Sequence, residues 1–130
     1  MSGNKPAMAE VQVAANRFAT WSVVCLCAQW CGVCRQYEAE FLALREKYPQ
    51  LRFVLMDVEE REDLLGEVDI ETFPTLLIGA GDKPKFLGPL LPQIKVLDRL
   101  LSSLLHDESA SSSLPPEAFS LWQRVAAQWQ

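Results

Sequence analysis

All four cysteines of this 130-residue chain lie within ten positions, in the stretch CLCAQWCGVC from Cys25 to Cys34. Thiols at this spacing support three kinds of chemistry: a metal site with cysteine ligands, a set of structural disulfides, or a reactive pair next to two cysteines that take no part in the reaction. Cys31 and Cys34 form a C-x-x-C pair, and residues three apart on a helix share one face, so their sulfurs can meet. The elements on either side of Cys31 therefore decide the chemistry.

A strand before the pair and a helix after it are predicted to position the sulfurs. Residues 21–28, WSVVCLCA, form a short apolar run without polar alternation, which is typical of a strand covered on both faces. From residue 32 to Tyr48 apolar side chains recur every three or four residues, and Pro49 ends this predicted helix. Cys31 then stands where unpaired backbone N–H groups and the positive end of the helix dipole favour a nucleophilic thiolate.

The other segments predict a mixed α/β fold. In chain order the patterns indicate a helix at 9–19, a strand at 51–58, a short helix at 60–67, an antiparallel hairpin within 72–88 that turns at Gly-Asp-Lys, and a helix at 92–105. The strand-helix-strand order around the cysteines suggests parallel neighbours. We expect an α/β domain in which helices flank a central mixed β-sheet.

The C-terminal part of the chain is predicted to be an appendage of this domain. Residues 1–106 form the domain, and 107–116, DESASSSLPP, form a Ser/Pro-rich linker. Residues 117–130 form an amphipathic helix whose apolar side carries Phe119, Trp122, Val125, Ala126 and Trp129. We expect this helix to pack back onto the domain rather than bind a partner or a membrane, because aromatic faces are usually core.

Charge and hydropathy exclude several partners. The formal net charge of −5 argues against nucleic acid and against an anionic membrane surface. Seven carboxylates lie between Asp57 and Asp69, and we interpret this run as a solvated loop and short helix rather than an acidic docking patch. The N-terminal 18 residues lack the apolar core of a secretory signal, and no early apolar run could span a membrane. We expect a cytoplasmic location, where clustered cysteines are more often catalytic or metal-binding than structural.

Two motifs resemble the thioredoxin family. The run Trp30-Cys31-Gly32-Val33-Cys34-Arg35 resembles the W-C-G-P-C-K active site of thioredoxins, and Phe73-Pro74-Thr75 resembles their cis-proline loop. The similarity extends from about Ala9 to Leu105 and includes Gly88 in the turn before the last family helix. C-x-x-C alone is shared with zinc sites, but the preceding Trp, the flanking strand and helix and the later Pro-Thr make the resemblance specific.

The resemblance implies a thioredoxin fold and a thiol–disulfide oxidoreductase. Cys31 would attack a substrate disulfide, and Cys34 would then resolve the mixed disulfide. Pro74 would be cis. The resemblance also implies substrate contacts at Trp30, Gly32, Val33, Phe73, Pro74, Thr75 and Gly88. The implied partners are disulfide-containing proteins and a thioredoxin reductase as electron donor, without a cofactor or metal.

Four positions depart from the family pattern. Cys25 replaces a buried Asp, and Leu55 aligns with the buried Lys that accompanies it. Replacing the Asp and the Lys together leaves no unpaired buried charge, which would destabilise the fold. Val33 replaces the usual Pro between the cysteines, so the redox potential should differ from that of a general reductant. Cys27 takes the place of a common Trp beside the active site.

Cys25 and Cys27 are predicted to point to the same side of their strand. Neighbours two apart on a strand rarely bridge, because their side chains run parallel. We expect Cys27 to act as a small buried apolar residue. The family resemblance places Cys25 beneath the active pair, where it would either pack in the same way, accept a proton, or trap Cys34 in an alternative disulfide.

Four alternative functions remain open from the residues alone. A zinc or iron–sulfur site with C-x-C-x3-C-x2-C ligands is disfavoured because two sulfurs lie on a strand, two on a helix, and no His is nearby. A cysteine hydrolase would need a base, and the single histidine is His106, far along the chain. A thioredoxin-like binding or assembly module with little turnover, or a redox sensor using Cys25, would keep the fold. The motifs favour the oxidoreductase.

Overall fold

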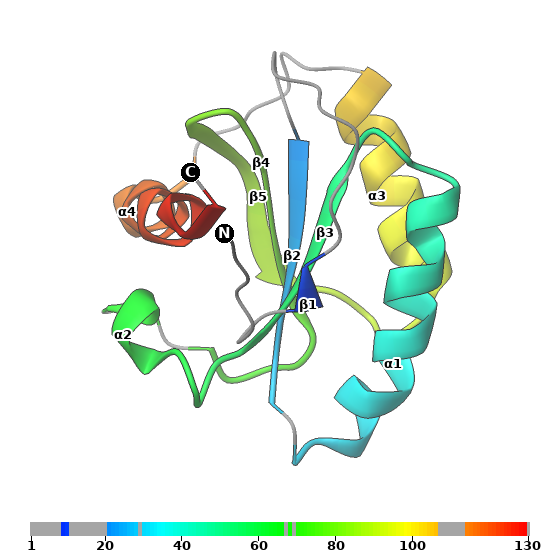
Figure 1. Ribbon diagram of the computed structural model, residues 1–130, viewed down its shortest axis with the longest axis horizontal. Coiled ribbons are helices and arrows are strands. Elements are labelled where there is room, and N and C mark those ends of the chain that lie inside the picture. The colour runs from blue at the N-terminus through cyan, green and yellow to red at the C-terminus, as the bar shows by residue number, and fades with distance from the viewer. Residues whose placement is uncertain are drawn as a thin grey trace.

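A computed structural model describes residues 9–10, 21–28, 30–66, 68, 70–106 and 114–129 of the chain (Figure 1). Its elements are, in order, β1 (Ala9–Glu10), β2 (Trp21–Cys27), α1 (Gly32–Ala43), η1 (Leu44–Glu46), β3 (Arg52–Asp57), α2 (Glu62–Leu65), β4 (Thr75–Ala80), β5 (Lys83–Pro89), α3 (Ile94–His106), α4 (Pro116–Ala126) and η2 (Ala127–Trp129). The strands form one mixed sheet in the order β1-β3-β2-β4-β5. The predicted α/β fold, a central mixed sheet flanked by helices, is confirmed.

The central strand of the sheet is β2, and all seven of its residues are buried. It pairs in parallel with β3 on one side and antiparallel with β4 on the other. A strand that is covered on both faces has few positions that favour polar side chains, which explains its almost unbroken apolar run. Because α1 connects two parallel neighbours, it begins at the sheet edge where β2 ends.

Side-chain alternation along β2 divides the core into two layers. Val23, Cys25 and Cys27 face α1 and α3. Val24 and Leu26 face α2 and α4. Figure 1 shows these two pairs of helices on opposite sides of the sheet. The face that carries both strand cysteines is therefore the face covered by the C-x-x-C helix.

The hairpin of β4 and β5 determines where α3 lies. The two strands pair antiparallel, from Thr75 opposite Pro89 to Ala80 opposite Lys83. The turn between them uses Gly81 at a φ of 61°, a conformation that favours glycine. Because β5 is antiparallel to β4 and β4 is antiparallel to β2, strands β5 and β2 run in the same direction. Their C-terminal ends therefore lie at the same edge of the sheet. Both α1 and α3 begin at this edge, and α3 ends with His106 at the opposite edge (Figure 1).

The C-terminal helix packs back onto the domain, as expected. Its buried residues are Ala118, Leu121, Trp122, Val125 and Ala126. The indole N–H of Trp122 donates to the carbonyl of Gly81 at 3.0 Å. A Cβ at Gly79 would approach both the Trp122 ring and the carbonyl of Lys83 to 2.7 Å, so the absent side chain makes room for the indole. Among the described residues no helix, α4 included, is long and apolar enough to cross a membrane.

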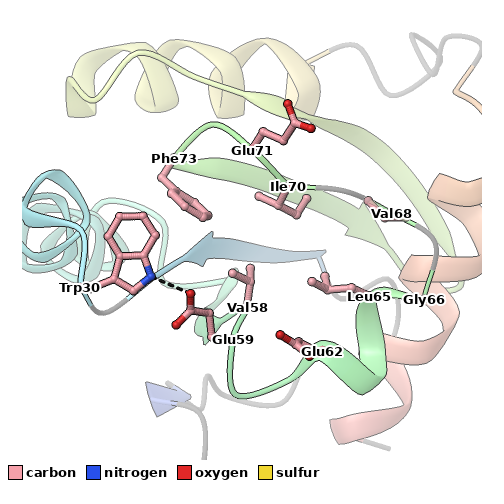
Figure 2. Close-up of a pocket in the computed structure, with 10 residues that line it drawn as sticks. All are labelled: Trp30, Val58, Glu59, Glu62, Leu65, Gly66, Val68, Ile70, Glu71 and Phe73. Carbon is pink, nitrogen blue, oxygen red and sulfur yellow. Dashed lines mark hydrogen bonds between the residues drawn. The ribbon is translucent and has the colours of Figure 1, made fainter.

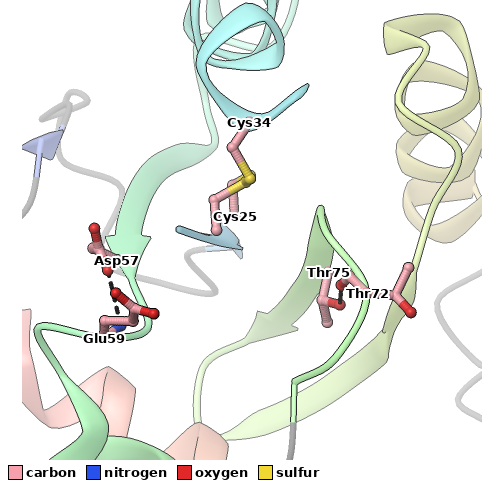
Figure 3. Close-up of a disulfide and its surroundings, with 7 residues drawn as sticks. Cys25, Cys34, Asp57, Glu59, Thr72 and Thr75 are labelled. Carbon is pink, nitrogen blue, oxygen red and sulfur yellow. Dashed lines mark hydrogen bonds between the residues drawn. A yellow bond between two sulfur atoms is a disulfide. The ribbon is translucent and has the colours of Figure 1, made fainter. Parts of the chain in front are cut away.

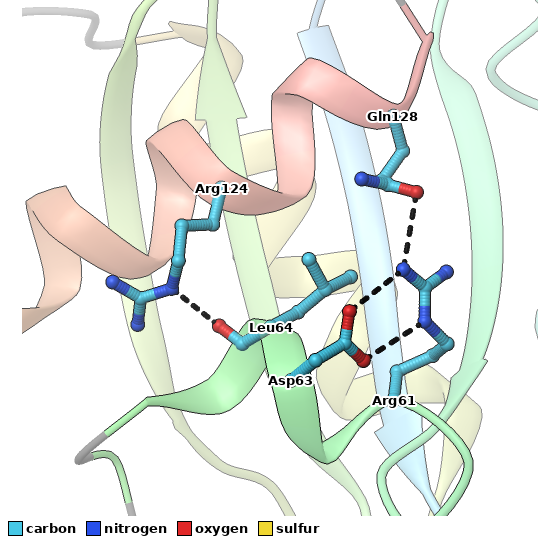
Figure 4. A network of polar contacts seen from close by, with 5 residues as sticks. All are labelled: Arg61, Asp63, Leu64, Arg124 and Gln128. Atoms are coloured by element: carbon cyan, nitrogen blue, oxygen red, sulfur yellow. Dashed lines mark hydrogen bonds and ion pairs between the residues drawn. The ribbon is translucent and has the colours of Figure 1, made fainter.

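Polar contacts join α4 to the short helix α2 (Figure 4). The guanidinium of Arg124 donates to the carbonyls of Leu64 and Leu65, at 2.6 and 2.9 Å. The last carbonyls of a helix lack intrahelical donors, so Arg124 caps α2. Arg61, just before α2, donates to the side chain of Gln128 at 3.3 Å. The C-terminal helix therefore holds α2 in place.

The predicted N-terminal helix is wrong where the structure describes it. Ala9 and Glu10 form β1, which pairs antiparallel with Leu55 and Val54 of β3. On its side away from β2, strand β3 has backbone N–H and C=O groups that need hydrogen-bond partners, and β1 pairs with them. The apolar periodicity of residues 9–19 does not reveal this requirement. Residues 11–19 of the predicted helix and 107–113 of the predicted linker lie outside the described residues.

Candidate active site

Cys31 lies at the start of α1, where the chain leaves the edge of the sheet. It is the N-cap residue of the helix, with extended backbone angles of φ −86° and ψ 118°. Its N–H donates to the carbonyl of Ala28 at 3.0 Å, and its carbonyl accepts from the N–H of Arg35 at 3.2 Å. Cys31 is a free, partly exposed thiol. An accessible thiol at a helix N-terminus is an arrangement that thiol nucleophiles use.

Cys34, in the first turn of α1, forms a disulfide with Cys27 at the end of β2 (Figure 3). Their Cα atoms are 5.8 Å apart, within the usual range for disulfides. Both residues are buried, with exposed fractions of 4% for Cys34 and 9% for Cys27. The bond ties the central strand to the start of the helix, and Cys25 and Cys31 are the free cysteines.

This pairing corrects the expectation for Cys27 and differs from the pairing that the family resemblance implies. The family resemblance implies a bond between Cys31 and Cys34, and Cys27 is expected from the sequence only to fill space. The structure instead gives Cys34 a partner on the strand, and that partner is Cys27 rather than Cys25. The reason is position along β2: both strand cysteines face α1, but Cys27 is the last strand residue and lies beside the first helical turn.

Cys25 is a buried thiol beneath the disulfide. It has no exposed surface, and its thiol donates a weak hydrogen bond to Sγ of Cys27 at 3.8 Å. Burial, and secondarily the negative charge of Glu38, raises the pKa of Cys25 to about 12. The thiol is therefore protonated at neutral pH, which argues against the proton-acceptor hypothesis. Leu55 is its neighbour on β3, so this pair of positions is uncharged, as the sequence indicates.

Trp30 connects the cysteine turn to two other segments (Figure 2). Its ring meets that of Phe73 edge-on, with 5.8 Å between the centroids. Its indole N–H donates to the carboxylate of Glu59 at 2.7 Å. The side chain is nevertheless 63% exposed, so it presents an aromatic surface directly before Cys31. Exposed aromatic rings with a polar edge are frequent in protein interfaces.

The loop before β4 forms the second side of the site. The Phe73–Pro74 peptide bond is cis. The carbonyl of Pro74 accepts from the N–H of Leu90 at 3.1 Å, and the hydroxyl of Thr75 donates to the carbonyl of Thr72 at 2.5 Å. The first bond ties the loop to Leu90, just after β5, and the second closes the loop on itself, so that Phe73 is held against Trp30.

The predicted substrate contacts fall into two groups. Those in or against the cysteine turn are Trp30, Gly32, Val33 and Phe73. Val33 is exposed beside Cys31. Thr75 and Gly88 line a separate small pocket of about 290 Å³, and Pro74 is buried. The structure therefore brings the first group together around Cys31 and places Thr75 and Gly88 in the adjoining pocket.

A larger pocket of about 570 Å³ opens beside Trp30 (Figure 2). Its lining residues are Trp30, Val58, Glu59, Glu62, Leu65, Gly66, Val68, Ile70, Glu71 and Phe73. The N–H of Val58 donates to the carbonyl of Cys27 at 2.8 Å, so the pocket wall is continuous with the disulfide. Apolar side chains form much of the lining, and three carboxylates lie among them.

Sequence reasoning missed this pocket. The interpretation of the acidic run as solvated is confirmed for Glu59, Glu60, Glu62 and Asp63, which are all exposed. Two of them, Glu59 and Glu62, also line the pocket. The sequence carries no specific signal for the pocket, because acidic residues interrupted by buried apolar ones such as Leu65 are equally the pattern of an ordinary surface helix.

The alternative chemistries find little support at this site. Within the described part of the chain, no three His, Cys, Asp or Glu side chains are grouped so that they could hold a metal ion. The bond between Cys27 and Cys34 also uses two of the four sulfurs that a zinc cage would need. His106 ends α3 at the sheet edge opposite Cys31, too far to act as its base.

The family model described as Thioredoxin matches residues 8–91. A Thioredoxin H-type from Populus jackii is 34% identical over 80 residues, which cover 59% of this chain and 58% of the relative. Thioredoxin-3, mitochondrial, from Saccharomyces cerevisiae is 36% identical over 52 residues, which cover 40% of this chain and 41% of the relative. The matched part of the chain thus spans about half the length of these relatives.

Solved structures give the same result for the fold. The crystal structure of oxidized mitochondrial thioredoxin 3 from Saccharomyces cerevisiae superposes with a TM-score of 0.58 at 26% identity, covering 65% of this chain and 78% of that one. The structure of Fasciola hepatica thioredoxin superposes with a TM-score of 0.59 at 24% identity, covering 65% and 80%. The second similarity is one of fold alone.

Proposed function

Because this chain belongs to the thioredoxin family, we propose that it is a thiol–disulfide oxidoreductase that acts on protein disulfides through Cys31 and Cys34. The observation that carries the proposal is the position of Cys31, a free and partly exposed thiol at the start of α1, next to the exposed Trp30. Cys34, three residues later, is buried. Disulfide exchange requires an accessible attacking thiol and a second thiol close enough to resolve the mixed disulfide.

The proposed reaction has two half-reactions. The thiolate of Cys31 attacks one sulfur of the substrate disulfide, forms a mixed disulfide and expels the other sulfur as a thiolate. The thiolate of Cys34 then attacks Sγ of Cys31, releases the second substrate thiolate and leaves a Cys31–Cys34 disulfide. The substrate is reduced by two electrons and the cysteine pair is oxidised by two. Cys34 can take part only when its bond to Cys27 is open.

A dithiol donor must return the pair to the reduced state. We propose an enzyme of the thioredoxin reductase class, since such a donor reduces a protein disulfide by the same exchange chemistry. We propose the cytoplasm as the location, because a reducing compartment supplies the dithiol donors that this cycle needs.

The direct test is catalysed reduction of insulin disulfides. With dithiothreitol as the electron source, the full chain is expected to raise the rate of insulin reduction in proportion to its concentration, measured as turbidity from the released chains. The proposal is rejected if the rate equals that of dithiothreitol alone at every protein concentration.

A second candidate function is a thioredoxin-like binding or assembly module with little turnover. It is favoured by one observation, the bond that removes Cys34 from exchange. Such a module would bind partners without accelerating insulin reduction, so the same assay separates the two functions. A sensor based on Cys25 is not supported, because that thiol is buried and protonated.

The larger pocket indicates the class of substrate. Glu59, Glu62 and Glu71 place negative charge around an apolar lining next to Trp30. Figure 2 shows that Glu59 and Glu62 lie on the side formed by the β3–α2 segment, and that Phe73 and Ile70 lie across from them. Charge complementarity and apolar burial together select an extended peptide segment that carries an apolar residue next to Lys or Arg. We propose that such a segment flanks the substrate disulfide.

Removing two negative charges from the larger pocket is expected to weaken the preference for disulfides flanked by Lys or Arg. In the double variant Glu62→Gln/Glu71→Gln, kcat/KM for a peptide disulfide flanked by Lys should fall about 2- to 10-fold, because exposed charge pairs are each worth up to ~1 kcal/mol. Added salt should reduce the difference by screening. The matched control is Glu40→Gln/Glu46→Gln, which alters two exposed carboxylates outside the pocket. Equal effects of the two variants, or equal rates for Lys- and Glu-flanked peptides, would contradict the proposed selectivity.

A further inference from the structure

Cys34 is within reach of two different disulfide partners. It is bonded to Cys27 in the structure, and their Cα separation of 5.8 Å allows this bond with the backbone as it stands. Cys31 lies three residues before Cys34 at the start of the same helix, the spacing at which a C-x-x-C pair closes. One possible partner of Cys34 is partly exposed and the other is buried.

We propose that Cys27 is a third redox-active cysteine, which takes over the disulfide that Cys34 forms with Cys31. This inference rests on the proposed oxidoreductase function and extends it from a two-cysteine to a three-cysteine cycle. It assigns a chemical role to a residue that packing arguments treat as inert.

The transfer is an exchange within the protein. After substrate reduction has produced the Cys31–Cys34 disulfide, the thiolate of Cys27 attacks Sγ of Cys34. The Cys27–Cys34 bond forms, the Cys31–Cys34 bond breaks, and Cys31 leaves as a thiolate. No further oxidant is consumed, because one disulfide replaces another. The proton that Cys27 loses is balanced by the proton that Cys31 takes up when it returns to the thiol form.

Burial explains the direction of the transfer. Cys27 and Cys34 are 9% and 4% exposed, whereas Cys31 is partly open to solvent. A disulfide is neutral and tolerates an apolar environment, but a thiolate loses hydration there. Moving the bond inward and the thiolate outward therefore lowers the free energy. The thiol of Cys25, whose sulfur is 3.8 Å from that of Cys27, supplies a hydrogen-bond donor to the Cys27 thiolate during the exchange.

The transfer changes what the oxidised protein can do. Cys31 becomes a free nucleophile again while the protein still stores one disulfide. A second substrate attacked by Cys31 would remain covalently bound, because Cys34 is no longer available to resolve it. Reduction of the Cys27–Cys34 bond would then release that substrate. An ordinary two-cysteine oxidoreductase has no free active-site thiol in its oxidised form.

Peptide mapping of the oxidised full-length protein tests this proposal. The reduced protein is mixed with insulin at less than one substrate disulfide per protein molecule, so that the freed Cys31 meets no second substrate, then quenched with N-ethylmaleimide, digested without reduction and analysed by mass spectrometry. In the wild type we expect a Cys27–Cys34 bridge and alkylated Cys31. In Cys27→Ala and the more conservative Cys27→Ser we expect a Cys31–Cys34 bridge and loss of alkylation at Cys31. Circular dichroism establishes that each variant is folded.

Two further variants separate the transfer from direct oxidation. Cys25→Ala also removes one sulfur from β2. It should reach the same Cys27–Cys34 bridge as the wild type, but more slowly, because the Cys27 thiolate loses its hydrogen-bond donor. In Cys31→Ser, insulin should produce no Cys27–Cys34 bridge, because neither buried cysteine can meet a protein disulfide directly. If that bridge forms at the wild-type rate without Cys31, the transfer is wrong.

The outcomes distinguish this inference from the function on which it rests. An oxidised wild type that contains only the Cys31–Cys34 bridge, yet reduces insulin, overturns the role of Cys27 and leaves the oxidoreductase function intact. Insulin that stays intact, with no bridge in the protein, overturns the oxidoreductase function itself. Alkylated Cys31 together with a Cys27–Cys34 bridge, lost in both Cys27 variants, supports the three-cysteine cycle.

Discussion

Replacement of Cys31 by serine is expected to lower the catalysed rate of insulin reduction at least about 100-fold, to the background of dithiothreitol alone. A serine hydroxyl does not attack disulfides under these conditions, and the other cysteines offer no substitute. Cys34 is only 4% exposed and Cys25 is fully buried, so neither can meet a disulfide in another protein. The measurement is the initial rate of turbidity at matched protein and dithiothreitol concentrations.

The control for this prediction is a substitution in α1, the helix that begins directly after Cys31. Gln36→Ser changes an exposed residue of α1 outside both pockets and should retain the wild-type rate. Cys34→Ser should behave differently from both, since Cys31 still attacks but the mixed disulfide is not resolved, so a covalent insulin adduct accumulates. A Cys31→Ser protein that keeps more than about one tenth of the wild-type rate would show that another group is the nucleophile.

Replacement of Trp122 by alanine is expected to lower the free energy of unfolding by about 3–5 kcal/mol. Trp122 is 1% exposed and is among the largest fully buried side chains of the domain. Its removal would leave a cavity above Gly79, because the indole occupies the space that a side chain there would fill. It would also break the hydrogen bond to the Gly81 carbonyl. The measurement is urea unfolding followed by circular dichroism.

Phe119 provides the matched control on the same helix. It is 42% exposed, so Phe119→Ala should cost less than about 1.5 kcal/mol, because less apolar surface returns to water. If Trp122→Ala costs no more than Phe119→Ala, then α4 does not contribute to the core as the structure shows.

The C-terminal helix also supports the candidate site. The family match ends at residue 91, whereas α4 begins at Pro116. Across the sheet face it packs beside α2, a helix of only four residues. Through Arg124 it caps the carbonyls of Leu64 and Leu65, and Leu65 lines the larger pocket. A segment outside the family match therefore supports a wall of the pocket in which we propose that substrates bind.

Most of the elements could be predicted from local sequence patterns. The apolar run of β2, the three- and four-residue periodicity of α1 and the turn residues between β4 and β5 all report burial or backbone geometry over short distances. The C-terminal helix was equally predictable, because its apolar side requires a surface to cover. Pairing of β1 with β3 was not predictable in this way, since it depends on a free sheet edge supplied by residues about 45 positions away.

The sequence by itself determined the family, the order of the elements flanking the cysteines, and the position of Cys31 at the start of a helix with Cys34 three residues later. Only the tertiary structure decided which sulfur bonds to Cys34 and which carboxylates line a pocket. Cys25 and Cys27 are the same residue type on the same face of β2, and they differ only in their position along the strand relative to the first turn of α1. How the helix packs on the sheet decides which of the two lies beside Cys34, and local sequence patterns do not encode that packing.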